Sequence, residues 1–248
     1  MTVIKDNLNH YHVSFVVEID TKQYHAESQS IGIDLGIETF ATLSTGEKIK
    51  APDYSKLDRK LRRAQRHLAR CQKGSKRRER ARLRVAKLQK KIANIRKDFL
   101  HKLSTRLVKE NSVVVLEDLN VSGMMKNRCL SRAITQQGWS MFRVMVEAKT
   151  HIVEDRELVV ISRWEPTSQV CSTCGYRWGK LDLSVREVKC INCGSVHDRD
   201  ENAAVNIDRV GVGHTHDNEN KRTVNECKTG DSSGSTALSN QLVAFKVS

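Results

Sequence analysis

Alternating apolar and polar positions predict several strands along the chain. Residues 11–19 alternate with the two-residue period of a half-buried strand. Residues 31–50, IGIDLGIETFATLSTGEKIK, predict two further strands, the first one buried, with a turn at residues 44–47 before the second. Short β-branched runs predict two more buried strands at 111–120 and 157–162.

A helical period replaces this alternation elsewhere. Residues 56–109 repeat apolar positions every three or four residues in two runs separated by Gly74-Ser75, which predicts an antiparallel helical hairpin with a narrow apolar seam. Residues 131–154 and 201–210 also follow a helical pattern. Strands with interspersed helices predict the α/β class. From about residue 211 the chain is rich in small polar residues without periodicity, and we expect it to be mostly disordered.

Positive charge is concentrated in the hairpin. Residues 56–109 hold 22 Lys and Arg against 3 Asp and Glu, while the whole chain of 248 residues carries +14. Like charges at this density repel unless a polyanion neutralises them, so we expect contact with nucleic acid, and a solvated helical arm is the alternative. Aromatic residues make up only 5%, which argues against base stacking as the main binding device. The expected phosphate contacts are Arg59, Arg62, Arg63, Arg66, Arg70, Lys76, Arg77, Arg78 and Arg84.

Four of the seven cysteines form two close pairs. Two Cys-x2-Cys turns lie fifteen residues apart, and a glycine follows each pair, where a tight turn needs a permissive backbone. Four thiolates complete a tetrahedron around zinc and leave no open position, so this zinc is expected to be structural; a redox dithiol is the alternative. The expected zinc ligands are Cys171, Cys174, Cys190 and Cys193.

The remaining cysteines have no partner by spacing. Cys71 fits the hairpin seam, and Cys129 and Cys227 are interpreted as ordinary thiols. The odd number of cysteines and the lack of a secretory signal predict reduced thiols in the cytoplasm. No apolar run approaches the roughly 18 residues of a membrane span.

Three carboxylates stand at the ends of predicted core elements. Asp34 lies in the buried IGIDLG strand, Glu117 ends the VVVLE strand, and Asp200 precedes the last helix. Carboxylates are the hard ligands that Mg²⁺ prefers, and three of them suit a pair of ions about 3.5–4 Å apart that hydrolyses a phosphodiester. Asp118 and Asp198 are the nearest substitutes.

Each carboxylate also has an ordinary interpretation. Asp34 could pair with a buried Lys or Arg, Glu117 could be a strand-end charge, and Asp200 could cap the helix that follows. His197, next to the acidic cluster, is interpreted as structural or solvent-facing rather than catalytic.

Several motifs occur together in one order. They are GIDLGIETFATLSTG, VVVLEDLNVSGM, RAITQQGWSMF, CSTCG, CINCG and DRDENAAVNI. Together they resemble the OrfB/TnpB family of insertion-sequence proteins and, more distantly, the compact type V CRISPR effectors. The resemblance runs from about residue 10 to residue 210.

The resemblance implies an RNase H-like (RuvC) nuclease domain with a zinc ribbon inserted before its last helix. It implies that Asp34, Glu117 and Asp200 are the catalytic, Mg²⁺-binding acids, that the four paired cysteines hold zinc, and that DNA and a guide RNA are the partners. Family members carry an N-terminal half with a wedge-like β-barrel, of which the final strands are expected to remain here. The expected segments are 1–29 for that remnant, 30–165 for the nuclease core with the hairpin 56–109, 166–196 for the zinc ribbon, 197–210 for the last helix and 211–248 for a disordered tail.

The function expected from the sequence is that of a transposon-associated DNA endonuclease, guided by RNA in the full-length family. Two alternatives stay open. A shortened chain could bind DNA or RNA without cutting, and the same metal chemistry could serve a strand-transferring transposase.

Overall fold

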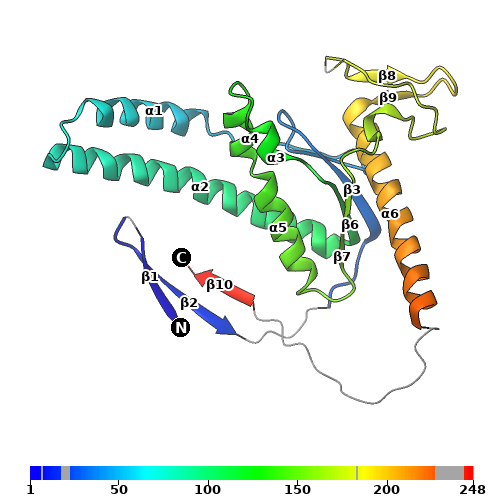
Figure 1. Ribbon diagram of the computed structural model, residues 1–248, viewed down its shortest axis with the longest axis horizontal. Coiled ribbons are helices and arrows are strands. Elements are labelled where there is room, and N and C mark those ends of the chain that lie inside the picture. Colours follow the sequence, from blue (N-terminus) through cyan, green and yellow to red (C-terminus); the bar gives the residue numbers. More distant parts are fainter. Residues whose placement is uncertain (7, 18–22, 183, 227–242, 248) are drawn as a thin grey trace. The chain divides into compact units, whose positions relative to one another are not determined.

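The computed structural model describes residues 1–6, 8–17, 23–182, 184–226 and 243–247 (Figure 1). The chain divides into two compact units. The first comprises residues 1–20, 52–99 and 234–248, and the second comprises residues 21–51 and 100–233. None of the described helices combines the length and apolar composition needed to cross a membrane.

The first unit pairs a small sheet with the helical hairpin. Its sheet has the antiparallel order β1-β2-β10, and the predicted strand at 11–19 is found as β2 up to Val17. Asp6, which follows β1, accepts a hydrogen bond from Lys90 of the hairpin, which lowers the pKa of the Asp6 carboxyl. The elements are β1 (Thr2–Lys5), β2 (Tyr11–Val17), β10 (Val243–Val247), α1 (Ser55–Arg70) and α2 (Lys76–Glu110), whose last turns belong to the second unit.

The predicted hairpin is confirmed, with its turn between α1 and α2. Up to Phe99, the buried apolar residues of the two helices are Ala64, Ala81, Val85 and Ile92, and the helices lie side by side (Figure 1). The hairpin up to Phe99 groups with the N-terminal strands and not with the segment 30–165 expected from the sequence.

The second unit is built on a mixed five-stranded sheet in the order β5-β4-β3-β6-β7. The strands β3, β6 and β7 run parallel, and β4 and β5 add antiparallel to β3. The α/β class predicted from the sequence is confirmed. The strands are β3 (Ser28–Leu35), β4 (Ala41–Leu43), β5 (Lys48–Ile49), β6 (Asn111–Glu117) and β7 (Glu157–Ile161).

Helices cover both faces of this sheet. Figure 1 shows α5 and α6 on opposite sides of the strands, α5 against β7 and α6 along β3, β6 and β7. On the side of α5, the rings of Phe40 and Phe142 meet edge to face at 5.4 Å. The helices are α3 (Val121–Met124), α4 (Ser131–Gln137), α5 (Trp139–Thr150), the short 3₁₀ helix η1 (Thr167–Gln169) and α6 (Arg199–Glu226).

Two helix boundaries differ from the prediction. The helix expected over 131–154 is divided at Gly138, whose φ of 73° lies in the left-handed region that ends a helix. The last helix was expected to end at 210, and the structure continues α6 to Glu226, so disorder from residue 211 is wrong for residues 211–226. The rest of the expected tail lies outside the described residues, apart from β10.

Candidate functional site

Two of the predicted carboxylates end neighbouring parallel strands. In the ladder between β3 and β6, Gly32 is opposite Val115 and the following residues are opposite each other in turn. Two further steps in this register bring Asp34 beside Glu117, on strands about 4.8 Å apart. Because side chains alternate along a strand, both acids lie on the face that Gly32 and Val115 present.

The helix α6 lies directly against that face. A Cβ on Gly32 would be 2.2 Å from the carbonyl oxygen of Ala204, and a Cβ on Gly211 would be 2.3 Å from a methyl group of Val115. Only glycine at these two positions allows so close an approach of helix and sheet. The packing of α6 is therefore fixed at two points along its length.

The third predicted carboxylate is carried by the first turn of α6. Asp200 lies one helical turn before Ala204, which touches β3 two residues before Asp34. The three acids therefore come from three elements and reach one end of the sheet. Asp34, Glu117 and Asp200 all line a single cavity of about 650 Å³.

The electrostatics of this cavity show that its acids are close enough to repel. Burial, as the largest cause, and the charges of Asp200 and Glu117 together raise the pKa of Asp34 to about 7. Burial also raises the pKa of Glu117, and its neighbour Asp118 adds to this. A cation would relieve the cost of bringing these carboxylates together.

Asp118, one alternative to Glu117, is engaged elsewhere. Its two oxygens accept hydrogen bonds from Arg143 at 3.0 Å and from Arg163, and these bonds lower the pKa of Asp118. Asp118 does not line the cavity that holds the three predicted acids.

Asp198, the alternative to Asp200, acts as the helix cap. Its Oδ1 accepts the backbone N–H groups of Asp200 and Glu201 at 3.0 and 3.1 Å, and its Oδ2 pairs with Lys48 at 2.6 Å. Burial works against ionisation of Asp198, yet these bonds lower its pKa overall. The capping role that the sequence left open for Asp200 therefore belongs to Asp198.

Arginines on the cavity wall were missed from the sequence. Arg186 lies 3.5 Å from Asp200 and 3.0 Å from Glu38, and Arg199 donates to the carbonyl of Asp182 at 2.8 Å. Arg186 and Arg199 both line the cavity, as does Arg163 from the loop after β7. A chain with 43 Lys and Arg gives no sequence signal that marks these three.

The paired cysteines form the tightest group of metal-ligating side chains in the described part of the chain. The sulfurs of Cys171, Cys174, Cys190 and Cys193 all lie within 4.8 Å of one another. This group could hold a metal such as zinc. Asp34, Glu117 and Asp200 do not form a group of this kind.

The two cysteine turns share one backbone pattern. Gly175 donates to the carbonyl of Cys171 and Gly194 to that of Cys190, each at 2.9 Å. The two glycines have φ values of 75° and 76°, as their positions in the sequence predicted. The strands β8 (Glu187–Lys189) and β9 (Val196–Asp198) complete the cysteine module (residues 166–198).

His197 lies against the cysteines. Its Nε2 is 3.1 Å from Cys171 Sγ, and its ring is tilted against Trp178 at 6.1 Å between centroids. His197 does not line the carboxylate cavity.

Side-chain hydrogen bonds attach the cysteine module to α6. Asn202 Oδ1 accepts from the N–H of Ser172, and its Nδ2 donates to the carbonyl of Val170. Asn206 donates to the carbonyls of Val170 and Thr167, each at 2.7 Å. The module is therefore anchored on the helix that carries Asp200.

Most of the predicted phosphate contacts are available on the hairpin. Of the nine, only Arg78 is not fully exposed. Arg78 donates to the carbonyls of Leu68 and Cys71 at 3.2 and 3.0 Å, so it satisfies orphan carbonyls at the end of α1. These nine residues belong to the first unit.

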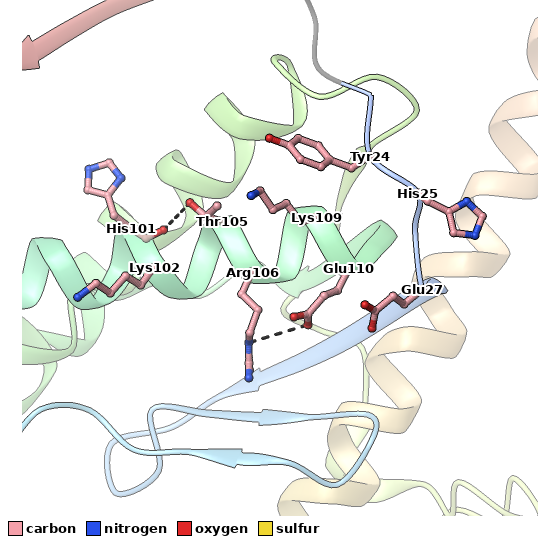
Figure 2. A pocket seen from close by; sticks show the side chains of 9 residues that line it. All are labelled: Tyr24, His25, Glu27, His101, Lys102, Thr105, Arg106, Lys109 and Glu110. Atoms are coloured by element: carbon pink, nitrogen blue, oxygen red, sulfur yellow. Dashed lines mark hydrogen bonds and ion pairs between the residues drawn. The ribbon is translucent and has the colours of Figure 1, made fainter.

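A second cavity of about 650 Å³ lies beside the last turns of α2 (Figure 2). Figure 2 shows Lys109 reaching toward Tyr24, whose ring centroid is 4.7 Å from the ammonium group. Arg106 is held by Glu47 at 3.0 Å. None of the three predicted acids lines this cavity, so it is separate from the carboxylate site.

Two family models match this chain. Residues 14–128 match OrfB_IS605, described as a probable transposase, and residues 139–207 match the model described as Cas12f1-like, TNB domain.

Curated relatives match most of the chain. A Streptomyces pristinaespiralis protein named "Putative RNA-guided DNA endonuclease" is 47% identical over 213 residues, which are 86% of this chain and 52% of that protein. "Putative RNA-guided DNA endonuclease InsQ" of Escherichia coli (strain K12) is 32% identical over 206 residues, which are 77% of this chain and 50% of that protein. The chain thus spans about half the length of these relatives.

One solved structure is also similar. A chain in "Cryo-EM structure of the Cas12f1-sgRNA-target DNA complex" aligns with a TM-score of 0.48 and 17% identity, over 72% of this chain and 49% of that one.

Proposed function

Because residues 14–128 belong to the OrfB_IS605 family of probable transposases and residues 139–207 to the Cas12f1-like TNB domain family, we propose that this chain is the nuclease part of a transposon-associated, RNA-guided DNA endonuclease. The names of its relatives describe that activity. The sheet order β5-β4-β3-β6-β7, with β3, β6 and β7 parallel, supports an RNase H-like (RuvC) core.

One observation carries the proposal. Asp34, Glu117 and Asp200 reach the same cavity from β3, β6 and α6, whereas Asp118 and Asp198, the two substitutes suggested by the sequence, are engaged by arginine, lysine or backbone groups. These three carboxylates are the proposed catalytic residues.

The donor set fits Mg²⁺. Carboxylates are hard oxygen ligands, and the raised pKa of Asp34 is expected for a carboxyl that is buried and lies near two other acids. Bound there, Mg²⁺ would supply an activated water and stabilise the leaving oxygen of the phosphodiester. Arg163, Arg186 and Arg199 on the cavity wall would hold phosphate oxygens of the DNA strand.

The cysteine module has a supporting role in this proposal. Four sulfur ligands leave no open position, so its zinc would be structural. Its two asparagine anchors on α6 would then hold Arg186 next to Asp200.

The hairpin supplies a second candidate function. Eight exposed basic residues among the nine predicted contacts could bind DNA or guide RNA without help from the cavity. A non-cleaving nucleic-acid binder is therefore the rival proposal.

Cleavage by the purified chain tests the proposal. The protein is isolated with its co-purifying RNA and given end-labelled DNA that carries the complement of that RNA, in Mg²⁺ and in EDTA. Cutting in Mg²⁺ alone is expected. Glu117→Gln should lower the cleavage rate by more than about 100-fold. Loss of a residue that only hydrogen-bonds to a metal ligand costs about 10–100-fold, and loss of the ligand itself should cost more.

Glu157→Gln is the matched control. Glu157 is exposed at the opposite end of the parallel strands, where it is opposite Val113 in the ladder. The Glu157→Gln variant should therefore cut DNA at the rate of the unaltered chain. Binding of DNA and RNA without cutting would favour the rival proposal. Equal cutting by Glu117→Gln and the unaltered chain would refute the assignment of the acids.

A further inference from the structure

Trp164 is the one tryptophan of the chain that stands in solvent. Its exposed fraction is 86%, whereas Trp139 is 3% exposed and Trp178 is half-buried with its Nε1 donating to the carbonyl of Ser168. Within the described residues, the side chain of Trp164 has no hydrogen bond or ring contact. Packing of the fold therefore gives no reason for a large aromatic residue at this position.

The position of Trp164 in the chain sets it at the rim of the carboxylate cavity. The loop after β7 begins at Ser162, and both neighbours of Trp164, Arg163 and Glu165, line the cavity. The hydroxyl of Ser162 accepts the backbone N–H of Trp164 at 3.3 Å, and its carbonyl accepts that of Glu165 at 3.1 Å. The loop that presents the ring is thus held in a defined turn.

The neighbouring charge favours a polyanionic strand. Arg163 is oriented by Asp118, which Arg143 also holds, so two guanidinium groups lie next to the base of this loop. Arg186 and Arg199 lie on the same cavity wall. An aromatic face beside cations is the combination that binds single-stranded nucleic acid, in which a base stacks while the backbone follows the charges.

We propose that Trp164 forms a nucleobase-stacking site that holds one base of single-stranded DNA at the entrance to the carboxylate cavity. The inference rests on the proposed function for the identity of the strand. Stacking on Trp164 would fix the register of the strand, so that a phosphodiester lies over the acids. Stacking requires an unpaired base, so the site takes single strands and not intact duplex.

Tryptophan fluorescence tests this site without any cleavage. Oligo(dT) is added to the protein in EDTA at about 0.15 M salt, and quenching of tryptophan emission is recorded. The account predicts quenching for the unaltered chain and for Trp178→Phe, and its loss in Trp164→Phe, because only Trp164 is free to stack. An abasic oligomer of the same length, which carries the charge without bases, should not quench.

Affinity for the same oligomers gives a second readout. Trp164→Ala should weaken binding of oligo(dT) by about 5- to 150-fold, the range that corresponds to the loss of one stacked base, and should leave binding of the abasic oligomer unchanged. Trp164→Phe should retain much of the affinity, since phenylalanine also stacks. The exposure of Trp164 means that neither variant removes packing contacts.

The outcomes separate this inference from the proposed function. Quenching that persists in Trp164→Phe, quenching by the abasic oligomer, or equal affinity in Trp164→Ala would overturn the stacking site, whether or not the chain cuts DNA. Loss of quenching in Trp164→Phe from a chain that never cuts would leave the stacking site standing and refute the nuclease proposal instead.

Discussion

At the scale of single residues, the cavity is marked by Asp34. Burial and the charges of two other acids hold the pKa of its carboxyl near 7, far above the ordinary value of 3.8. The sequence singled out the three acids as a set, because each stands at the end of a predicted core element. It did not predict Arg186 or Trp164, because their roles depend on which loops border the cavity.

Asp34→Asn should stabilise the metal-free chain in a pH-dependent way. A carboxyl with a raised pKa binds its proton more tightly in the folded state, so its contribution to stability falls as pH rises from about 4 to 7. The asparagine of the variant does not ionise, so the variant does not lose this free energy of unfolding as pH rises. It should be more stable than the unaltered chain by up to about 4 kcal/mol at pH 8, and the two should be equally stable near pH 4.

Urea unfolding in EDTA at several pH values measures this difference. Millimolar Mg²⁺ should reduce the advantage of the variant at pH 8, because ions stabilise only the chain that keeps Asp34. A stability difference that does not change with pH would contradict the electrostatic account.

Gly32→Ala should be strongly destabilising. The added Cβ would meet the backbone of α6 at 2.2 Å, and neither the helix nor the central strand can shift cheaply, so a loss of about 3 kcal/mol or more is expected. Gly213→Ala, also on α6, has nothing within 4 Å of its Cβ and should gain about 0.5–1 kcal/mol. Thermal unfolding compares the two; similar melting temperatures would show that α6 does not pack on β3 as described.

At the scale of elements, periodicity was a good guide where it was long. The hairpin was predicted because its apolar pattern repeats over many residues, and the buried strands were predicted from short β-branched runs. The break between α4 and α5 was missed because a single glycine, Gly138, decides it. The length of α6 was missed because its second half lacks an apolar stripe, and the cap was left open because Asp198 and Asp200 look alike in sequence.

Loss of the cysteine cluster should destabilise the cysteine module locally and leave the five-stranded sheet folded. In Cys171→Ser, bound zinc should disappear from elemental analysis and amide hydrogens of residues 170–198 should exchange faster, while those of β3 and β6 stay protected. Cys129→Ser, at an exposed cysteine outside the cluster, should keep its zinc and its exchange pattern. Full zinc content in Cys171→Ser would contradict the assignment of the ligands.

At the scale of the whole molecule, charge is divided between parts. The hairpin carries more positive charge than the entire chain, so the remainder is net acidic. This division is consistent with two binding functions: the hairpin would bind backbone phosphates, and the cavity would bind cations. The sequence alone revealed this division, because the basic residues are concentrated in one segment.

Binding of nucleic acid to the hairpin should depend steeply on salt. The triple variant Arg62→Ala, Arg63→Ala, Arg66→Ala should flatten the plot of log affinity against log salt by about 0.9 for each duplex phosphate contact that is lost. Arg78→Ala should change the slope little, because its guanidinium is committed to backbone carbonyls, and should instead lower thermal stability. An unchanged slope in the triple variant would mean that the hairpin is a solvated arm.

Anomalous X-ray diffraction from crystals of the chain grown with Mn²⁺, a substitute for Mg²⁺ with a usable signal, would locate the ions at the three acids directly. The account predicts peaks between Asp34, Glu117 and Asp200, and their disappearance in Glu117→Gln. A well-ordered cavity without any peak at millimolar Mn²⁺, or peaks bound only by other residues, would contradict it.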